Sequence, residues 1–221
     1  MMNISENIAK LSGEIPAGVK IVAVSKMMPV EMIMVAYHAG HRIFGENKAQ
    51  ELSSKQPQLP ADICWHFIGH LQTNKVKHIA PFIGTIESVD SLKLLKEIDR
   101  EAFKSHRIIK CLLQFHIATE ETKFGLDLQE AEDLLNNPEY KTLKNVMLSG
   151  VMGMASFSED ESLVRKEFQH LKSVFNLLKD KYFHEDQRFC EISMGMTGDY
   201  RIALEEGSTI IRIGTGIFGK P

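Results

Sequence analysis

A lysine at the end of a predicted strand is the first residue suited to covalent chemistry. Lys26 ends the segment KIVAVSK (20–26), whose β-branched residues predict a strand. Because side chains alternate along a strand, Lys26 shares a face with Val22 and Val24. If that face lines a barrel interior, loss of hydration lowers the pKa of the amine and frees it to attack a carbonyl group. Such a lysine could form a Schiff base; the alternative is a lysine that reaches from the strand end into water.

An arginine inside a later predicted strand is suited to binding. Arg212 lies in STIIRIGT (208–215), where it shares a face with Ile210 and Gly214. An arginine that points into a barrel needs a partner, because it cannot lose its proton to escape the cost of burial. Two kinds of partner stay open: a carboxylate such as Glu191, which would make the pair structural, or a bound ligand.

Two loops rich in glycine and hydroxyl groups could hold a phosphate. In barrels of alternating strands and helices, phosphate commonly binds the loops after the seventh and eighth strands through backbone amides. Glycine permits close approach of the backbone, and hydroxyls donate hydrogen bonds, although the same residues also form ordinary turns. The loops are Ser193-Met194-Gly195-Met196-Thr197 and Gly214-Thr215-Gly216.

Other ionisable residues near predicted strand ends leave alternatives open. Glu46, Glu87 and Asp90 could act as acids or bases, although solvated or capping carboxylates are more common. His66 and His70 straddle a strand end and a loop, so we do not expect them to bind a metal as a pair. The sequence has no GxxxxGK[ST] phosphate loop, no GxGxxG after a strand and no HExxH motif.

The elements that must position these residues alternate along the chain. Short β-branched runs predict eight strands, and the amphipathic stretches between them predict helices. The predicted strands are 20–26, 41–47, 63–69, 82–88, 108–115, 148–154, 189–193 and 208–215.

Start and stop signals delimit several helices. The segment 29–39 begins with proline at a tolerated position and is followed by glycine. A second helix begins after Asp90, and an extra helix covers residues 3–11. The clearest helix begins at Ser158, which forms a predicted capping box with Glu161 ahead of an apolar stripe.

Eight strands, each but the last followed by a helix, predict a parallel sheet closed into a single (β/α)8 barrel of the TIM type. No linker rich in proline or glycine divides the sequence, so we expect residues 1–221 to form one domain. Ligands of such barrels bind at the carboxyl ends of the strands, and closure makes the last strand a neighbour of the first. Lys26, Arg212 and both loops would then border one mouth. The aldehyde, ring nitrogen and phosphate of pyridoxal 5′-phosphate (PLP) match these three features.

Composition narrows the class of protein. The 221 residues include 26 Lys plus Arg and 29 Asp plus Glu, with 43% hydrophobic and 25% charged residues. These values are typical of a globular protein and lack the basic excess of a non-specific nucleic-acid binder. We expect no membrane partner, because no apolar run approaches the roughly 18 residues of a membrane helix. Cys64, Cys111 and Cys190 lack disulfide spacing and are expected to be buried, reduced thiols in a cytoplasmic protein without a signal peptide.

Seven segments resemble one protein family, in order and over nearly the whole chain. They resemble the PLP homeostasis proteins, which are similar to the barrel domain of alanine racemase standing alone. The longest segment is highly specific. The segments are VAVSK (22–26), RIFGEN (42–47), WHFIGHLQTNK (65–75), ETKFGL (121–126), GVMGM (150–154), SMGMTGDYRIALEEGST (193–209) and RIGTGIFG (212–219).

This resemblance implies roles for individual residues. It implies a barrel like the alanine racemase N-terminal domain, with PLP held as a Schiff base on Lys26 and its pyridine nitrogen contacted by Arg212. The resemblance also places Asn47 near the ring substituents and makes His66 a wall of the site. The implied phosphate contacts are Ser193, Gly214 and Thr215, and Met194 and Gly195 belong to the same loop.

The implied site favours a carrier or regulator of PLP over an enzyme. Arg212 disfavours protonation of the pyridine nitrogen, because two positive charges would meet in a poorly screened site, so the ring is a weaker electron sink. Racemases of similar fold borrow a residue from a second β domain, and we expect no such domain after Pro221. The expected function is PLP homeostasis by a monomer, with PLP-dependent apo-enzymes as partners.

Two enzyme classes stay open as alternatives. One is a weak PLP-dependent racemase or lyase acting on a small amino acid. The other is a cofactor-free barrel enzyme acting on a sugar phosphate, with Glu46 or Glu87 as the base.

Overall fold

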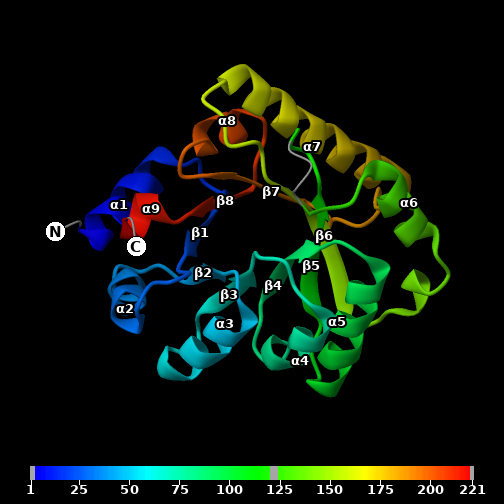
Figure 1. The fold of residues 1–221 in the computed structure, drawn as a ribbon, viewed down its shortest axis with the longest axis horizontal. Coiled ribbons are helices and arrows are strands. Elements are labelled where there is room, and N and C mark those ends of the chain that lie inside the picture. Colours follow the sequence, from blue (N-terminus) through cyan, green and yellow to red (C-terminus); the bar gives the residue numbers. More distant parts are fainter. Residues whose placement is uncertain (1–2, 120–123, 220–221) are drawn as a thin grey trace.

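The strands close into a parallel barrel in chain order, as the sequence predicts (Figure 1). The computed structural model describes residues 3–119 and 124–219. Within these residues the barrel comprises β1 (Lys20–Val24), β2 (Ile43–Glu46), β3 (Cys64–Phe67), β4 (Thr85–Val89), β5 (Ile109–Phe115), β6 (Val146–Gly153), β7 (Glu191–Met196) and β8 (Ile210–Ile213).

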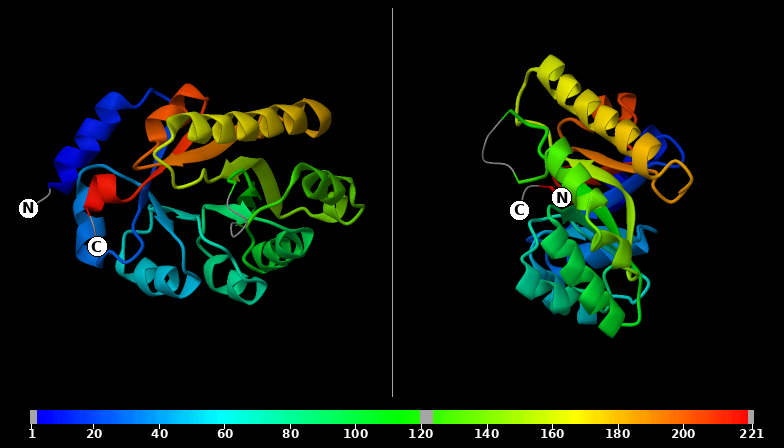
Figure 2. Two further views of the ribbon diagram at one scale, coloured as in Figure 1. Left: turned by 45° about the horizontal axis from the view of Figure 1, so that its top comes forward. Right: turned by 90° about the vertical axis from the view of Figure 1, so that its right-hand side faces the viewer.

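Helices surround the barrel, and α1, the predicted extra helix, packs against α2 and α9 (Figures 1 and 2). The expectation that no helix follows the last strand is wrong, because the single turn α9 begins directly after Gly214. The helices are α1 (Ile4–Glu14), α2 (Val30–His38), α3 (Ala49–Lys55), α4 (Val76–Ile79), α5 (Leu92–Lys104), α6 (Leu128–Asn136), α7 (Glu161–Tyr182), α8 (Tyr200–Glu205) and α9 (Thr215–Phe218). Short 3₁₀ turns are η1 (Gln56–Gln58), η2 (Thr73–Lys75) and η3 (Tyr140–Thr142).

The apolar residues form two separate layers. The large outer cluster fills the space between strands and helices, while a small inner cluster lies inside the barrel. The alternation of strand side chains produces this division. In β8, for example, Ile211 and Ile213 belong to the outer cluster and Ile210 to the inner one.

Helix α7 begins two residues later than a cap at Ser158 would require. Its N-cap is Asp160, whose carboxylate accepts hydrogen bonds from the backbone N–H groups of Ser162 and Leu163. Ser158 instead accepts a hydrogen bond from the Asp160 N–H through its hydroxyl. A carboxylate at this position also complements the helix dipole, so the aspartate is the better cap here.

The cysteines are not all buried, so that expectation is wrong. Cys111 is buried in β5, but Cys64 and Cys190 are exposed, and all three are free. Cys64 is the first residue of β3 and Cys190 directly precedes β7, so both lie at the amino-terminal end of the barrel. Among the described residues, no helix combines the length and apolar character needed to cross a membrane.

Candidate cofactor site

Barrel closure brings the turn after β1 and the loop after β8 together at one end of the barrel. Strand β1 pairs with β8, and Val22 lies opposite Arg212. One step further along, a Cβ atom on Gly214 would lie 3.5 Å from the Cβ of Val24. The turn that carries Lys26 and the loop that begins at Gly214 are therefore neighbours at the carboxyl ends of the strands, which we call the mouth.

Lys26 is exposed at the mouth, which favours the second alternative, a lysine that reaches from the strand end into water. The reason is that β1 ends at Val24 and the chain turns at Lys26 and Met27, which places the side chain beyond the regular alternation of the strand. Lys26 makes no hydrogen bond or ion pair with any residue that the structure describes. Its amine is therefore accessible to a molecule that enters the mouth.

A buried ionic cluster holds the turn that carries Lys26; we call Ser25, Glu46, Glu51 and Lys55 the Lys55 cluster. The Lys55 ammonium donates to the Ser25 carbonyl (2.8 Å), to Glu46 Oε1 (2.8 Å) and to Glu51 Oε1 (2.6 Å). The Ser25 hydroxyl donates to Glu46 Oε1 at 2.7 Å. Glu51 also accepts the backbone N–H of Met27, whose φ of 62° is in the left-handed region. These bonds stabilise a turn that a non-glycine residue adopts only at a cost.

The Lys55 cluster excludes Glu46 as a base at the mouth. Glu46 is fully buried, and its neighbour Gly45 lies on the opposite, inner face of β2, against Val22. Burial raises the pKa of Glu46 above its ordinary value, although the hydrogen bonds from Lys55 and Ser25 lower it. The other oxygen of this carboxylate, Oε2, has no hydrogen-bond partner in the structure. Glu46 therefore serves the turn.

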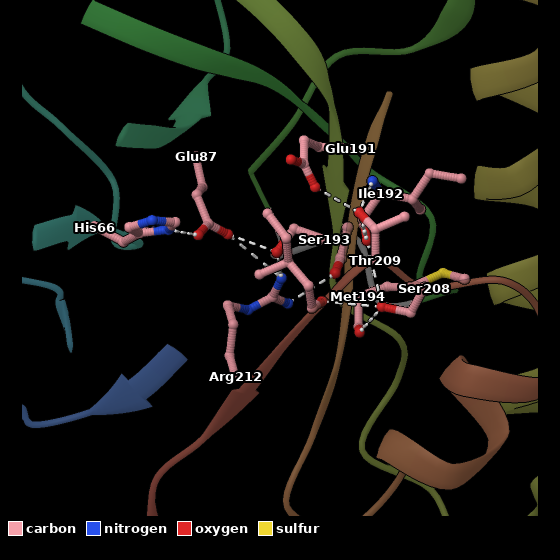
Figure 3. A network of polar contacts seen from close by, with 11 residues as sticks. His66, Glu87, Glu191, Ile192, Ser193, Met194, Ser208, Thr209 and Arg212 are labelled. Carbon is pink, nitrogen blue, oxygen red and sulfur yellow. Dashed lines mark hydrogen bonds and ion pairs between the residues drawn. The ribbon is translucent and has the colours of Figure 1, made fainter. Parts of the chain in front are cut away.

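Arg212 points into the barrel, as predicted, but its carboxylate partner is Glu87 and not Glu191 (Figure 3). The guanidinium is buried and donates from Nη1 to the Ser193 hydroxyl (2.5 Å) and from Nη2 to the Gly153 carbonyl (2.9 Å). Its Nη1 lies 3.8 Å from Glu87 Oε2. Burial lowers the pKa of Arg212, and the Glu87 charge opposes that shift.

Glu191 lies too far toward the amino-terminal end of β7 to meet Arg212. It is the first residue of the strand, and it pairs instead with Lys20, the first residue of β1. Its other oxygen accepts a hydrogen bond from the Thr209 hydroxyl at 2.7 Å. Figure 3 shows Glu191 directed toward Thr209, on the far side of Ser193 from Glu87.

A second buried ionic cluster, which we call the Glu87 cluster, comprises His66, Glu87, Ser193 and Arg212. Glu87 Oε1 lies 2.5 Å from His66 Nδ1, and Oε2 accepts the Ser193 hydroxyl at 2.5 Å. Burial acts to raise the pKa of Glu87, but His66, Arg212 and Ser193 together hold it below its ordinary value. Burial likewise acts to lower the pKa of His66, but Cys64 and Glu87 raise it to about 9. The barrel interior thus holds one carboxylate between two cations.

The phosphate loops divide into a buried part and an accessible part. Ser193 is fully buried, and its hydroxyl is committed to Glu87 and Arg212. Met194 is also fully buried, with its side chain in the outer apolar layer, so a ligand could meet only its backbone. Gly195 has a φ of +95°, and a Cβ there would lie 2.6 Å from the Cβ of Ala203, so packing against α8 already requires glycine.

The accessible hydroxyls are those of Thr197 and Thr215. Thr197 accepts a hydrogen bond from the Gly216 N–H at 3.3 Å, which joins the two loops. Thr215 is exposed at the first position of α9. Thr197 lies in the predicted phosphate loop, but the family resemblance does not name it as a phosphate contact. Its position at the end of that loop, beyond the buried strand residues, is the feature of the sequence that could have pointed to it.

Asn47 and the two histidines complete the predicted set. Asn47 follows β2 at the mouth, and a Cβ on Gly69 would lie 2.4 Å from its carbonyl oxygen, so these two loops touch. His70 Nδ1 lies 3.2 Å from Asp90 Oδ2, and its ring stacks on Phe124. Among residues 3–119 and 124–219, no group of three or more His, Cys, Asp or Glu side chains could hold a metal.

Comparison with known proteins places the chain in a family. The model of the alanine racemase N-terminal domain matches residues 1–221. The pyridoxal phosphate homeostasis protein of Aquifex aeolicus (strain VF5) is 37% identical over 203 residues, 91% of this chain and 86% of that protein. The human protein of the same name is 36% identical over 229 residues, 98% of this chain and 82% of that protein. The chain belongs to the pyridoxal phosphate homeostasis protein family.

Solved structures extend the comparison to the fold of the pyridoxal phosphate homeostasis proteins. PipY from Synechococcus elongatus PCC7942, solved without PLP, has a TM-score of 0.91 and 35% identity over 98% of this chain and 100% of that chain. PipY with PLP bound has a TM-score of 0.87 and 34% identity over the same shares. Alanine racemase from Bartonella henselae, at 17% identity and a TM-score of 0.73 over 99% of this chain and 62% of that chain, shares the fold. The predicted family and barrel are confirmed, while residues 121–123 of the segment ETKFGL lie outside the described residues.

Proposed function

We propose that residues 1–221 form a single barrel domain that binds PLP at the mouth and acts in PLP homeostasis as a carrier or regulator. The observation that carries this proposal is the position of Arg212. Its buried guanidinium lies beneath a mouth where β1 and β8 bring an accessible lysine amine beside a glycine and hydroxyl loop. A relative that is 34% identical, PipY, has been solved with PLP bound.

The residues at the mouth fit the chemistry of PLP. The aldehyde of this cofactor bonds covalently to primary amines. Lys26 offers such an amine without a competing partner among the described residues. The N–H of Thr215, the first residue of α9, lacks an intrahelical partner and can donate to a phosphate, whereas the Gly216 N–H already donates to Thr197. Arg212 supplies a fixed positive charge for the pyridine nitrogen, because Ser193 and Gly153 fix its orientation.

The roles of the remaining site residues follow from their accessibility. We assign the phosphate to Gly214, Thr215 and Thr197, and give Ser193 an indirect role through Arg212. Asn47 contacts the ring substituents from the loop after β2. The remaining contributions are those of Met194 and Gly195 through their backbone and of His66 through Glu87.

The permanent positive charge of Arg212 favours a carrier role. The ion pair with Glu87 and the impossibility of deprotonating arginine keep this guanidinium charged. A cation against the pyridine nitrogen disfavours protonation of the ring, which weakens it as an electron sink for amino-acid chemistry. Arg212 therefore favours storage and release of PLP over turnover.

Apolar side chains around the mouth support transfer to another protein. We propose that PLP-dependent apo-enzymes receive the cofactor from a monomer in the cytoplasm. Large apolar side chains are exposed on the loops after β1, β5 and β6 and at the last residue of β7, and a contiguous exposed apolar patch marks a protein contact. These residues are Met27, Phe124, Phe157 and Met196.

The test is a titration of the protein with PLP, followed by the absorbance of the bound cofactor. Thr215→Val and Thr197→Val each remove one hydrogen bond to a charged group, which costs about 1.5–3 kcal/mol, so each should weaken binding about 10- to 150-fold. Cys190→Ser, at the opposite end of the barrel, is the control and should bind like the unaltered protein. Undiminished binding by both threonine variants would exclude the phosphate assignment.

A second assay separates the carrier from the enzyme alternative. Protein loaded with PLP is mixed with D- and L-amino acids, and optical inversion or product release is followed. The proposal expects far less than about 1 turnover per second, the low end for ordinary enzymes. Turnover at or above that rate would establish a racemase or lyase.

A further inference from the structure

A cavity of about 340 Å³ lies at the amino-terminal end of the barrel, opposite the mouth. We call it the floor pocket. Six of the residues that line it open a strand, and none of the residues assigned to PLP lines it except His66. The strand-opening residues are Lys20, Ile43, Cys64, Thr85, Glu191 and Ile210.

The floor pocket contains an exposed thiol that faces an imidazole. Cys64 and His66 are two residues apart on β3, so both side chains point to the same, inner face. Behind His66, Nδ1 lies 2.5 Å from Glu87 Oε1. A thiol, an imidazole and a carboxylate therefore follow one another from the pocket into the barrel, the order that activates cysteine nucleophiles.

This order favours the ionised form of the thiol. Hydrogen bonding to His66 lowers the pKa of Cys64, and burial opposes it with a smaller effect; Lys110 and Lys20 lower it further. His66 stays protonated at neutral pH because Cys64 and Glu87 raise its pKa to about 9, against the effect of burial. Cys111 provides a contrast, because burial, together with the negative charge of Asp99, raises the pKa of that thiol.

The rim of the floor pocket is positively charged. Lys110 on β5 is exposed and makes no ion pair with a described residue, and Arg107 donates one hydrogen bond to the Ala80 carbonyl. Lys20 on β1 is neutralised by Glu191 on β7. With Lys20 paired to Glu191 and His66 paired to Glu87, Lys110 and Arg107 leave an excess of positive charge around the thiol, which attracts small anions.

Gly84 packs closely against the sulfur of Cys64. A Cβ on Gly84 would lie 2.9 Å from the Cys64 sulfur and 3.1 Å from the Trp65 carbonyl oxygen. Any larger residue at position 84 would push the sulfur out of its present position. Glycine at position 84 therefore leaves the space that the Cys64 sulfur occupies.

We propose that the floor pocket is a modification site in which Cys64 reacts with small disulfides that carry carboxylates. The Cys64 thiolate attacks one sulfur of the disulfide. A bond forms between the two sulfurs, the original S–S bond breaks, and the second half leaves as a thiolate with the electron pair. The proton of the Cys64 thiol stays on His66, while Lys110 and Arg107 hold the carboxylates.

The chain carries its own control, because Cys190 is exposed at the same end of the barrel. Each cysteine is followed by mass spectrometry during brief alkylation at pH 7 with anionic iodoacetate or neutral iodoacetamide. We expect Cys64 to react about tenfold faster than Cys190. We also expect its rate ratio of iodoacetate to iodoacetamide to be about fivefold higher, the effect of one unit charge at about 4 Å in water. Equal rates or equal ratios at the two cysteines would overturn the proposal.

Two variants and one disulfide complete the experiment. Lys110→Met should lower the iodoacetate preference of Cys64, whereas Lys10→Met, on α1, should leave it unchanged. Oxidised glutathione, a disulfide with carboxylates, should form a mixed disulfide at Cys64 before Cys190, and a reductant should reverse it. A mixed disulfide that forms first at Cys190, or a preference that survives Lys110→Met, would contradict the assignment.

Discussion

The Lys55 cluster and the Glu87 cluster each bury one carboxylate completely, yet the pKa values of the two carboxylates shift in opposite directions. Glu87 lies between His66 and Arg212, and its pKa is held low because these cations outweigh the effect of burial. Glu46 meets a single cation, Lys55, which it shares with Glu51, and burial raises its pKa. The environment of Glu87 therefore favours the ionised carboxylate, whereas the environment of Glu46 disfavours it.

The difference follows from what each cluster positions. The Lys55 cluster fixes a backbone turn, so its bonds end on the Ser25 carbonyl and the Met27 N–H. The Glu87 cluster fixes a cation inside the barrel, and only a compensating charge makes burial of Arg212 tolerable. The Glu87 cluster thus fixes the charge of Arg212, and the Lys55 cluster fixes the turn that carries Lys26.

Removal of the Glu87 charge should have the largest effect. Glu87→Gln keeps the shape but leaves Arg212 buried without its counter-charge, which costs about 3–5 kcal/mol in the free energy of unfolding. Urea unfolding at pH 7 measures this difference. A loss below about 1 kcal/mol would mean that the barrel interior does not depend on an ion pair.

Removal of the Glu46 charge should have a much smaller effect. In Glu46→Gln the amide oxygen can still accept from Ser25 and Lys55, so we expect a loss of about 1 kcal/mol or less. The same urea experiment gives the value. If Glu46→Gln destabilised the protein as much as Glu87→Gln, the distinction between the two clusters would be lost.

The two carboxylates should also respond to pH in opposite directions. A lowered pKa means that Glu87 contributes stability above its ordinary pKa of about 4.5 and loses it as the pH falls. A raised pKa means that the contribution of Glu46 is complete below about 4.5 and falls as the pH rises through the folded-state value. The stability difference from each glutamine variant should therefore slope in opposite directions with pH. Slopes of the same sign would show that the pKa values of Glu87 and Glu46 do not shift in opposite directions.

His66 should produce a third pH dependence. Its pKa is raised from about 6.5 to about 9, so its stabilising effect is complete below pH 6.5 and is lost as the pH rises through 9. The difference in unfolding free energy between the unaltered protein and His66→Asn should shrink over this range. A difference that stays constant to pH 10 would show that His66 is neutral in the folded protein.

The order of strands and the inward position of Arg212 could be predicted because both depend on local pattern. The alternation of side chains along β8 places Arg212 on the opposite face from Ile211 and Ile213, and β-branched runs mark all eight strands. The exposure of Lys26 could not be predicted in this way. It depends on the end of β1 two residues before Lys26, which is set by the contacts of Ser25 with Glu46 and Lys55.

The partner of Arg212 also depends on information that alternation does not contain. The register shifts between Ile86 and Val89 where β4 pairs with β5, and between Ser193 and Met196 where β7 pairs with β8. Such irregularities change which side chains from distant strands meet. Only the closed barrel brings Glu87 to Arg212 and leaves Glu191 with Lys20.

Reductive trapping shows which lysine holds PLP. The protein is incubated with PLP, reduced with borohydride, digested and mapped by mass spectrometry. We expect one dominant labelled site, Lys26. In Lys26→Arg, a variant that keeps the charge but lacks the primary amine, we expect no label at position 26. A label that resides mainly on another lysine, and persists in Lys26→Arg, would exclude Lys26 as the residue that holds PLP.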